Sequence, residues 1–418
     1  MKKHLPIFLS ALTLASACGC VQEKKVTAEE LSKEYVRAAT ESSADLTDFK
    51  LQFTDFSLNF FQKTVEKNEQ NKLFSPLSAA LCLALVNNGA NGNTRAQLEA
   101  LFGMDTDTLN RTLYAYTSSL YSGKNCKLSL ANTIWLKVQD LQVKPEFLQA
   151  NADWYNAQAY AAPFNETTVN DINNWCYNKT SGKISKILNE IPAYALMYLI
   201  NAVDFDAKWS EPYEREDIEK GVFHNYDGEK QDVTMLHSEE RRYFMDDNSV
   251  GFTRPYENSK YHFMALLPDE GVDIYEYIDS LNGEKWANLW ASSDPNQNEN
   301  YVYREVHARI PEFKYETDLS LKEILQTLGV TDMFNPDSAD FTGIDETQTL
   351  YCDVIKQKAM IELDRNGTKA AAVTWAGMKC MSAAPAEPLN ITLDRPFVFA
   401  IIDDEHKLPI FIGAVTNL

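Results

Sequence analysis

The stretch from residue 355 to residue 382 constrains the fold of this chain more than any other. Up to residue 364, apolar or neutral side chains at odd positions alternate with mostly charged ones at even positions, which is the period of a half-buried strand. Asn366-Gly367 then predicts a type I′ turn, because both central residues of such a turn need positive φ. The next even positions are all small and uncharged: Thr368, Ala370, Ala372, Thr374 and Ala376. The stretch therefore predicts a strand, a turn and a segment with one face that can be buried, or else a long exposed loop.

The length and charge of the chain limit its class. It has 418 residues, of which 44% are apolar, so it is long enough to bury a large core. Acidic residues outnumber basic ones 60 to 39, which gives a formal charge of −21. A phosphate-backbone partner would need clustered Lys and Arg, so no nucleic-acid partner is expected. No repeat or linker divides residues 46–418, which predicts a single domain.

The first 45 residues read as an export and attachment region. Two lysines precede an apolar run over residues 5–17 that is too short to span a bilayer, so residues 1–20 are predicted to be a signal peptide. Cys18 and Cys20 each follow small residues, as in a bacterial lipoprotein cleavage box; a plain secretory signal is the alternative. A lipid on either cysteine would hold the exported chain at a membrane of the cell envelope. Residues 21–45 are polar and are predicted to be a tether.

The residues that usually carry enzyme or metal chemistry are dispersed. Five cysteines follow residue 20 without paired spacing, and their odd number predicts at least one free thiol: Cys82, Cys126, Cys176, Cys352 and Cys380. The histidines also lie apart in the sequence: His4, His224, His237, His262, His307 and His406. The sequence contains no Gly-x-Ser-x-Gly, His-Glu-x-x-His or phosphate-loop motif. We therefore expect a protein that is not an enzyme and that needs no metal and no cofactor.

Hydrophobic periodicity predicts the main elements of the domain. Phenylalanines at roughly helical spacing indicate a helix over residues 46–67, and Ser75-Pro76 has the cap and first-turn residues that begin another. Apolar runs indicate strands over residues 127–137, 197–209, 262–267, 397–402 and 409–415, and a capped helix is expected over residues 317–328.

Three motifs together resemble the serpin family. Lys-Ala-Met-Ile-Glu-Leu (358–363), Gly-Thr-Lys-Ala-Ala-Ala-Val-Thr (367–374) and Asp-Arg-Pro-Phe-Val-Phe (394–399) are similar to its hinge, reactive-centre loop and closing strand. The resemblance implies an α+β serpin fold: a single large domain over residues 46–418 with a central, mostly antiparallel sheet, two further sheets and about eight or nine helices. It also implies an exposed reactive-centre loop at about residues 367–390.

The resemblance implies a protease inhibitor that acts as a suicide substrate. A serine protease cleaves the loop and forms a covalent acyl complex with a monomeric inhibitor, and the freed segment inserts into the central sheet before deacylation. Counting fourteen residues from Gly367 places the scissile bond at Met381-Ser382. An unbranched thioether suits the apolar pockets of elastase-, chymotrypsin- or subtilisin-like proteases. A loop shorter by one residue would offer Cys380 and suggest a cysteine protease, and one shorter by two would offer Lys379 to trypsin-like enzymes.

The same resemblance assigns the remaining site residues. The hinge consists of Gly367, Thr368, Ala370, Ala371, Ala372 and Thr374. The region where the sheet must open contains Ser75, Ser78, Asn201, Trp209, Gln357, Glu312 and Arg365. A charged or bulky inward residue in the hinge would favour a non-inhibitory serpin that acts as a carrier or interaction protein, and none is present.

Two charges depart from the family pattern. Serpins usually carry Glu two residues before the hinge glycine, where this chain has Arg365, and a basic residue after the proline of a neighbouring strand, where this chain has Glu312. In the family these two positions face each other at the top of the sheet. The double reversal predicts an Arg365–Glu312 ion pair of swapped polarity, and two unrelated surface charges are the alternative.

Overall fold

The long central strands form two separate ladders. The computed structural model describes residues 22–35, 37, 44–65, 70–137, 141–192, 194–347, 349–352, 354–368 and 386–418. One ladder runs in the spatial order β1 (Glu29–Glu30), β4 (Gln158–Ala161), β3 (Cys126–Leu136), β5 (Met197–Lys208) and β14 (Gly367–Thr368). The other joins β12 (Phe313–Ser320) to β13 (Lys356–Leu363). All pairings are antiparallel except that of β3 with β4.

Two further sheets complete the β structure. A six-stranded antiparallel sheet has the order β2 (Lys72–Phe74), β17 (Pro409–Val415), β16 (Phe397–Asp403), β10 (Tyr261–Pro268), β9 (Ser249–Pro255) and β8 (Arg242–Met245). A four-stranded sheet has the order β15 (Leu389–Thr392), β11 (Val306–Pro311), β7 (Lys230–Glu240) and β6 (Ile218–His224), in which β15 is parallel to β11. The residues of β16 and β17 are all buried, as their unbroken apolar runs predicted.

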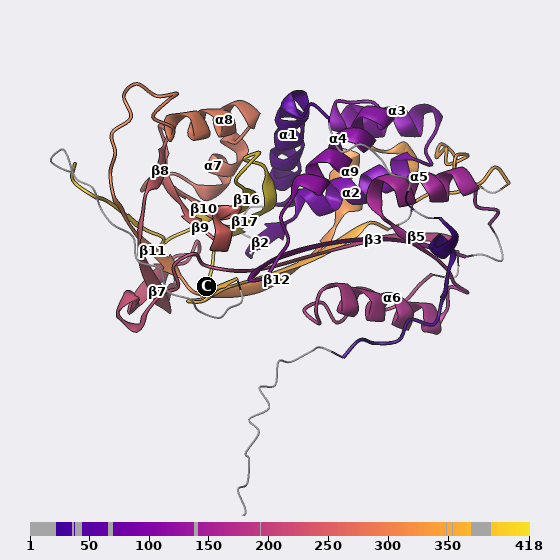
Figure 1. The fold of residues 1–418 in the computed structure, drawn as a ribbon, viewed down its shortest axis with the longest axis horizontal. Helices are drawn as coiled ribbons and strands as arrows, with labels where there is room; N and C mark the ends of the chain where they lie inside the picture. The colour runs from indigo at the N-terminus through magenta and orange to yellow at the C-terminus, as the bar shows by residue number, and fades with distance from the viewer. Residues whose placement is uncertain are drawn as a thin grey trace, which may run out of the picture.

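Nine α-helices are present among the described residues, within the predicted number. They are α1 (Thr47–Thr64), α2 (Pro76–Asn87), α3 (Gly92–Phe102), α4 (Thr106–Ser119), α5 (Pro145–Tyr155), α6 (Glu166–Lys179), α7 (Ile274–Ser280), α8 (Gly283–Ser292) and α9 (Leu321–Thr327). Helix α6 lies alone on one side of β3 and β5, and α1 to α5 with α9 gather on the other (Figure 1). The long strands therefore have helices on both faces.

The two faces of β5 belong to two different cores, as the alternation of side chains along a strand requires. Phe205 and Ala207 belong to a large core with α2 and the six-stranded sheet. Tyr198 and Ile200 point the other way and pack with Trp175 of α6. Any strand added beside β5 would thus have one face toward each core.

The predicted tether is partly folded. Residues 22–35 do not extend freely: β1 pairs with β4, and the backbone N–H groups of Thr27 and Ala28 donate to the buried Asp171 carboxylate of α6 at 2.9 and 2.8 Å. A polar composition indicated solvent exposure, but backbone groups bonded to a distant carboxylate determine the position of this segment. Residues 1–20, with the predicted signal peptide, lie outside the described part of the chain.

Two local predictions are corrected. The helix expected over residues 317–328 begins only at Leu321, because β12 continues to Ser320 with Thr317 and Leu319 buried on one face. The turn predicted at Asn366-Gly367 has Arg365 and Asn366 as its central residues, and neither has positive φ, so it is not type I′. Only Gly367, which closes the turn, has positive φ (+133°). In the described residues we find no helix with the length and apolar character needed to cross a bilayer.

Candidate functional site

The candidate site is the opening between β5 and β13. No ladder joins these two strands in the described part of the chain, and the first two residues after the turn, Gly367 and Thr368, pair instead with Lys208 and Ala207 at the end of β5. A Cβ atom at position 367 would lie 2.3 Å from the Ala207 carbonyl oxygen, so the close approach requires glycine there. Gly367 and Thr368 are thus placed as the beginning of an added strand beside the C-terminal end of β5.

Three donors hold the turn above the opening. The backbone N–H of Trp209 donates to the Asn366 carbonyl at 3.2 Å, and its indole Nε1–H donates to the Asp364 carbonyl at 2.9 Å. The N–H of Tyr213 donates to the Arg365 carbonyl at 3.2 Å. These bonds fix the turn to the end of β5, and Trp209 provides two of the three donors.

A buried ion pair lies behind Trp209. The Arg254 guanidinium lies 4.1 Å from the ring centre of Tyr213 and 5.1 Å from that of Trp209, and its Nη1 donates to Glu240 Oε1 at 2.5 Å. Burial raises the pKa of Glu240, against the attraction of Arg254, and burial raises the pKa of Tyr213 to about 12. Each of these buried charges is stabilised by the other, because an unpaired charge in an apolar surrounding would destabilise the fold. Sequence analysis missed this pair, whose members no motif connects.

The predicted contact between Arg365 and Glu312 is present. Arg365 Nε lies 3.5 Å from Glu312 Oε1, and the same oxygen accepts from the Arg365 backbone N–H at 3.2 Å. The Arg365 side chain is 50% exposed and that of Glu312 is 24% exposed. Exposed pairs of this kind contribute only about 0.2–1 kcal/mol to equilibrium stability. The pair joins the residue between β11 and β12 to the turn that follows β13.

We predict that reversing either charge speeds the conversion of the protein to latent or polymeric forms on mild heating. Arg365→Glu and Glu312→Lys each place like charges at this contact, and the double variant restores an attraction. Conversion rates followed by native gels over a double-mutant cycle isolate the coupling. The same exchange at Lys314 and Glu362, an ion pair at 2.9 Å that joins β12 and β13 themselves, is the matched control. A double variant that converts as fast as the sum of the singles predicts would contradict the coupling.

A buried hydrogen-bond network crosses the middle of the opening. From β13, Gln357 Nε2 donates to the Ser75 carbonyl at 2.9 Å, and Gln357 Oε1 accepts from the Ser75 N–H at 2.8 Å. Ser75 caps α2 by accepting from the Ser78 N–H at 3.3 Å, and Ser78 Oγ donates to Asn201 Oδ1 on β5. Asn201 Nδ2 in turn donates to Asn132 Oδ1 on β3. The end of α2 therefore connects the two strands that no ladder joins.

The network unites four of the residues assigned from sequence and adds one. Ser75, Ser78, Asn201 and Gln357 are all at most 8% exposed. Asn132 was not assigned; the available signal was an amide in the apolar part of a strand predicted over residues 127–137, at the position directly opposite Asn201. Buried amides of this kind are bonded to partners, so a lone polar residue in such a strand is itself informative.

Several assigned residues lie outside the described part of the chain. The hinge positions Ala370, Ala371, Ala372 and Thr374, the reactive bond Met381-Ser382, and Lys379, Cys380, Cys18 and Cys20 belong to this group. Their roles remain predictions. The other cysteines beyond residue 20 are all buried: Cys82, Cys126, Cys176 and Cys352.

Comparison with known proteins identifies the fold. The family model described as Serpin (serine protease inhibitor) matches residues 52–418, and the chain belongs to the serpin family. A leukocyte elastase inhibitor of Xenopus tropicalis is 29% identical over 384 residues, which cover 87% of this chain and 98% of that protein.

Solved structures agree with this assignment. The native state of the thermophilic serpin tengpin is 39% identical, with a TM-score of 0.86 over 94% of this chain and 100% of that one. Its latent state gives a TM-score of 0.79 at 39% identity over 91% and 100% of the two chains. Human thyroxine-binding globulin, solved with thyroxine, shares the fold at 22% identity, with a TM-score of 0.77 over 90% and 99%. The α+β serpin fold predicted from the sequence is confirmed.

Proposed function

We propose that this chain inhibits serine proteases as a suicide substrate, with Met381-Ser382 as the scissile bond. The protease attacks this bond and forms an acyl-enzyme, and the released segment enters the opening between β5 and β13 before water can deacylate the enzyme. The observation that carries the proposal is that Gly367 and Thr368 pair with Lys208 and Ala207 of β5, while β13 pairs with β12 and, among the described residues, has no ladder to β5. Named relatives such as the elastase inhibitor support the class of target.

The register of β14 supports the inward assignment of the even hinge positions. Gly367 pairs with Lys208 and Thr368 with Ala207. Continued antiparallel pairing places residue 370 opposite Phe205, residue 372 opposite Val203 and residue 374 opposite Asn201. Residues directly opposite in a sheet share a face, and this face of β5 points to the large core. Small uncharged residues at 370, 372 and 374 meet the requirement for burial there.

The same register brings an inserted strand next to the buried hydrogen-bond network of Ser75, Ser78, Asn201 and Gln357. Thr374 would reach the level of Asn201, where Ser78 and Gln357 now connect α2 to both flanking strands. Insertion therefore has to separate β13 from β5 at a point where buried polar groups already have partners. Such a barrier fits a fold that is kinetically stable, so that the rate of insertion and not an equilibrium free energy determines how long the starting state lasts.

Two alternative functions are also compatible with the serpin fold. A carrier role is represented by thyroxine-binding globulin, a distant structural relative, and inhibition of cysteine proteases would follow from cleavage after Cys380. The small hinge residues favour inhibition over a carrier role, and the count from Gly367 favours Met381 over Cys380.

Incubation with an elastase-like serine protease tests the proposal. We expect an adduct that survives denaturation, together with a released C-terminal fragment that begins at Ser382 by mass spectrometry. A clipped chain without an adduct would overturn the inhibitory function. Cleavage mainly after Ala376 or Ala384 would overturn the assignment of the bond.

A change at the proposed bond tests the specificity separately. Because residue 381 fills the primary pocket of the protease, Met381→Arg should lower the rate of elastase inhibition and raise that of trypsin inhibition by at least about tenfold each, a change of about 1.4 kcal/mol in transition-state binding. Met381→Leu, which remains apolar and close in volume, is the control and should keep elastase as the better target.

We propose further that the protein acts outside the cytoplasm, attached to a bacterial membrane by a lipid on Cys18 or Cys20. The motif at residues 15–20 supports this location. If it is right, metabolic labelling with a radioactive fatty acid marks the wild-type protein and not a variant with Ala at both positions. Equal labelling of the two proteins would exclude lipidation at these cysteines.

A further inference from the structure

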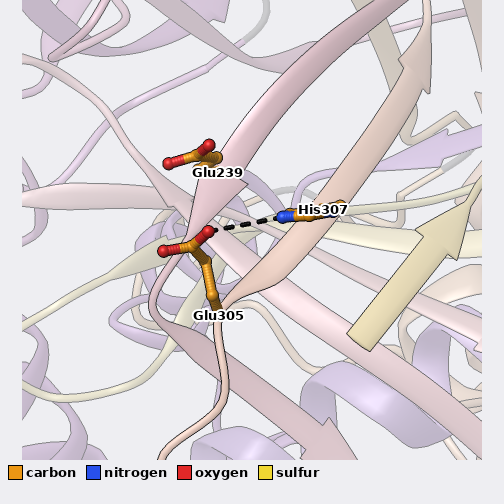
Figure 2. Close-up of side chains that lie close together, drawn as sticks. All are labelled: Glu239, Glu305 and His307. Carbon is orange, nitrogen blue, oxygen red and sulfur yellow. Dashed lines mark hydrogen bonds and ion pairs between the residues drawn. The ribbon is translucent and has the colours of Figure 1, made fainter. Parts of the chain in front are cut away.

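Three metal-ligating side chains converge on the four-stranded sheet, away from the opening. Glu239 is on β7, Glu305 immediately precedes β11, and His307 is the second residue of β11. Figure 2 shows the Glu305 carboxylate turned toward the His307 imidazole, with that contact marked, and Glu239 beside them. One ligand atom of each residue lies within 4.8 Å of those of the other two. Glu239 precedes Glu305 by 66 positions and His307 by 68, so no sequence motif connects it with them.

The sheet itself positions these groups. His307 and Glu239 are directly opposite in the antiparallel pairing of β11 and β7, which brings their Cβ atoms close together. Glu305 lies two residues before His307 and therefore on the same face. The His237 ring packs edge-to-face against the His307 ring with 6.0 Å between centres. A site built on paired strands has ligands of defined direction.

The donor set fits Zn²⁺. Imidazole and carboxylate are both zinc ligands, and two ligand atoms on a tetrahedral ion with bonds of about 2.1 Å lie roughly 3.4 Å apart. His307 Nε2 and Glu305 Oε1 are already 3.3 Å apart. Glu239 is exposed, and one of its carboxylate oxygens lies within 4.8 Å of the ligand atoms of the other two residues, close enough for Glu239 to serve as the third ligand. Two carboxylates give the site the charge to hold a dication, and the imidazole favours zinc over magnesium or calcium.

We propose that Glu239, Glu305 and His307 form a Zn²⁺ site that fastens β15 to β11. The Leu389 N–H, at the first residue of β15, donates to the Glu305 carbonyl at 2.8 Å, and Asn390 pairs with His307. Residue 305 thus supplies a ligand from its side chain and an anchor for β15 from its backbone. An ion bound here restrains the residues on which the start of β15 depends.

Titration of the untagged, chelator-treated protein with zinc chloride tests the site. We expect one ion per chain by calorimetry, and a loss of affinity greater than about tenfold in His307→Asn and in Glu239→Gln, each of which removes a ligand. His224→Asn changes an exposed histidine at the end of β6 and should leave binding unchanged. Glu239 is exposed, so its variant folds even if that at His307 does not, and far-UV circular dichroism checks both. Absence of binding, or equal affinity in wild type and both ligand variants, would overturn the site.

Hydrogen exchange tests the link to β15 without reference to protease inhibition. Zinc should slow exchange of the Leu389 and Leu393 amides, whose acceptors are the carbonyls of Glu305 and Arg309, by about threefold or more. The effect should vanish in Glu239→Gln. If zinc binds one site that both ligand variants remove but exchange at these amides is unchanged, the ion does not fasten β15 and that part of the proposal is wrong.

Discussion

Ala372→Arg should turn the proposed inhibitor into a substrate. If the register that begins with Gly367 and Thr368 on β5 continues in the inserted segment, residue 372 would come opposite Val203, whose side chain packs against the large core. An arginine there must lose its hydration as the strand enters, which costs several kcal/mol. Each ~1.36 kcal/mol added to the insertion barrier slows insertion tenfold, so a cost of about 2.7 kcal/mol would slow insertion about a hundredfold relative to deacylation. Denaturing gels should show cleaved chain in place of the covalent adduct.

Ala372→Thr is the matched control for this result. In the proposed register the threonines at 368 and 374 would share a face with residue 372, so the control should keep its adduct and its stoichiometry. If Ala372→Arg forms adducts as efficiently as the control does, then residue 372 does not enter the core and the register fails beyond Thr368.

The strand before the turn shows what local sequence encodes well. Its period of two predicted the buried face, and Gln357, Ala359, Ile361 and Leu363 are buried in β13. Ser75-Pro76 likewise predicted the start of α2, because the capping oxygen and the ring that fixes φ are properties of those two residues alone. Gly367 was predicted to have positive φ, and it does, although the turn type was wrong.

The errors arose where contacts distant in the sequence override a local pattern. The segment 317–320 contains residue types that cap helices. Its pairing with β13 nevertheless keeps it in a strand, whose buried face continues to Leu319. The polar residues 22–35 appeared to be a tether because nothing local indicates that Asp171 would accept their N–H groups. Spacing also made every histidine look isolated, and only the pairing of β7 with β11 brings His237 and His307 together.

The buried ion pair behind Trp209 should be the most sensitive stability determinant of the site. Glu240→Ala leaves the Arg254 guanidinium, whose residue is 5% exposed, without its carboxylate. Removing one partner of a buried pair costs about 3–5 kcal/mol, because the remaining charge stays buried. We therefore expect a large fall in the urea midpoint of unfolding. Glu229→Ala, which removes an exposed glutamate from the β6–β7 connection, should leave the midpoint nearly unchanged.

The reason for the size of this effect also determines how it can be reversed. If the cost of Glu240→Ala comes from the unpaired charge, then adding Arg254→Met should recover part of it, because the double variant buries no charge. Recovery will be incomplete, since Arg254 also donates to the Glu211 carbonyl and stacks on Tyr213 and Trp209. The opposite result is a double variant that is less stable than Glu240→Ala, by an amount equal to the full cost of Arg254→Met alone. That result would show that the two side chains act independently. In that case the support beneath Trp209, and through it the turn at residues 364–366, would depend on the stacking of the guanidinium and not on its charge.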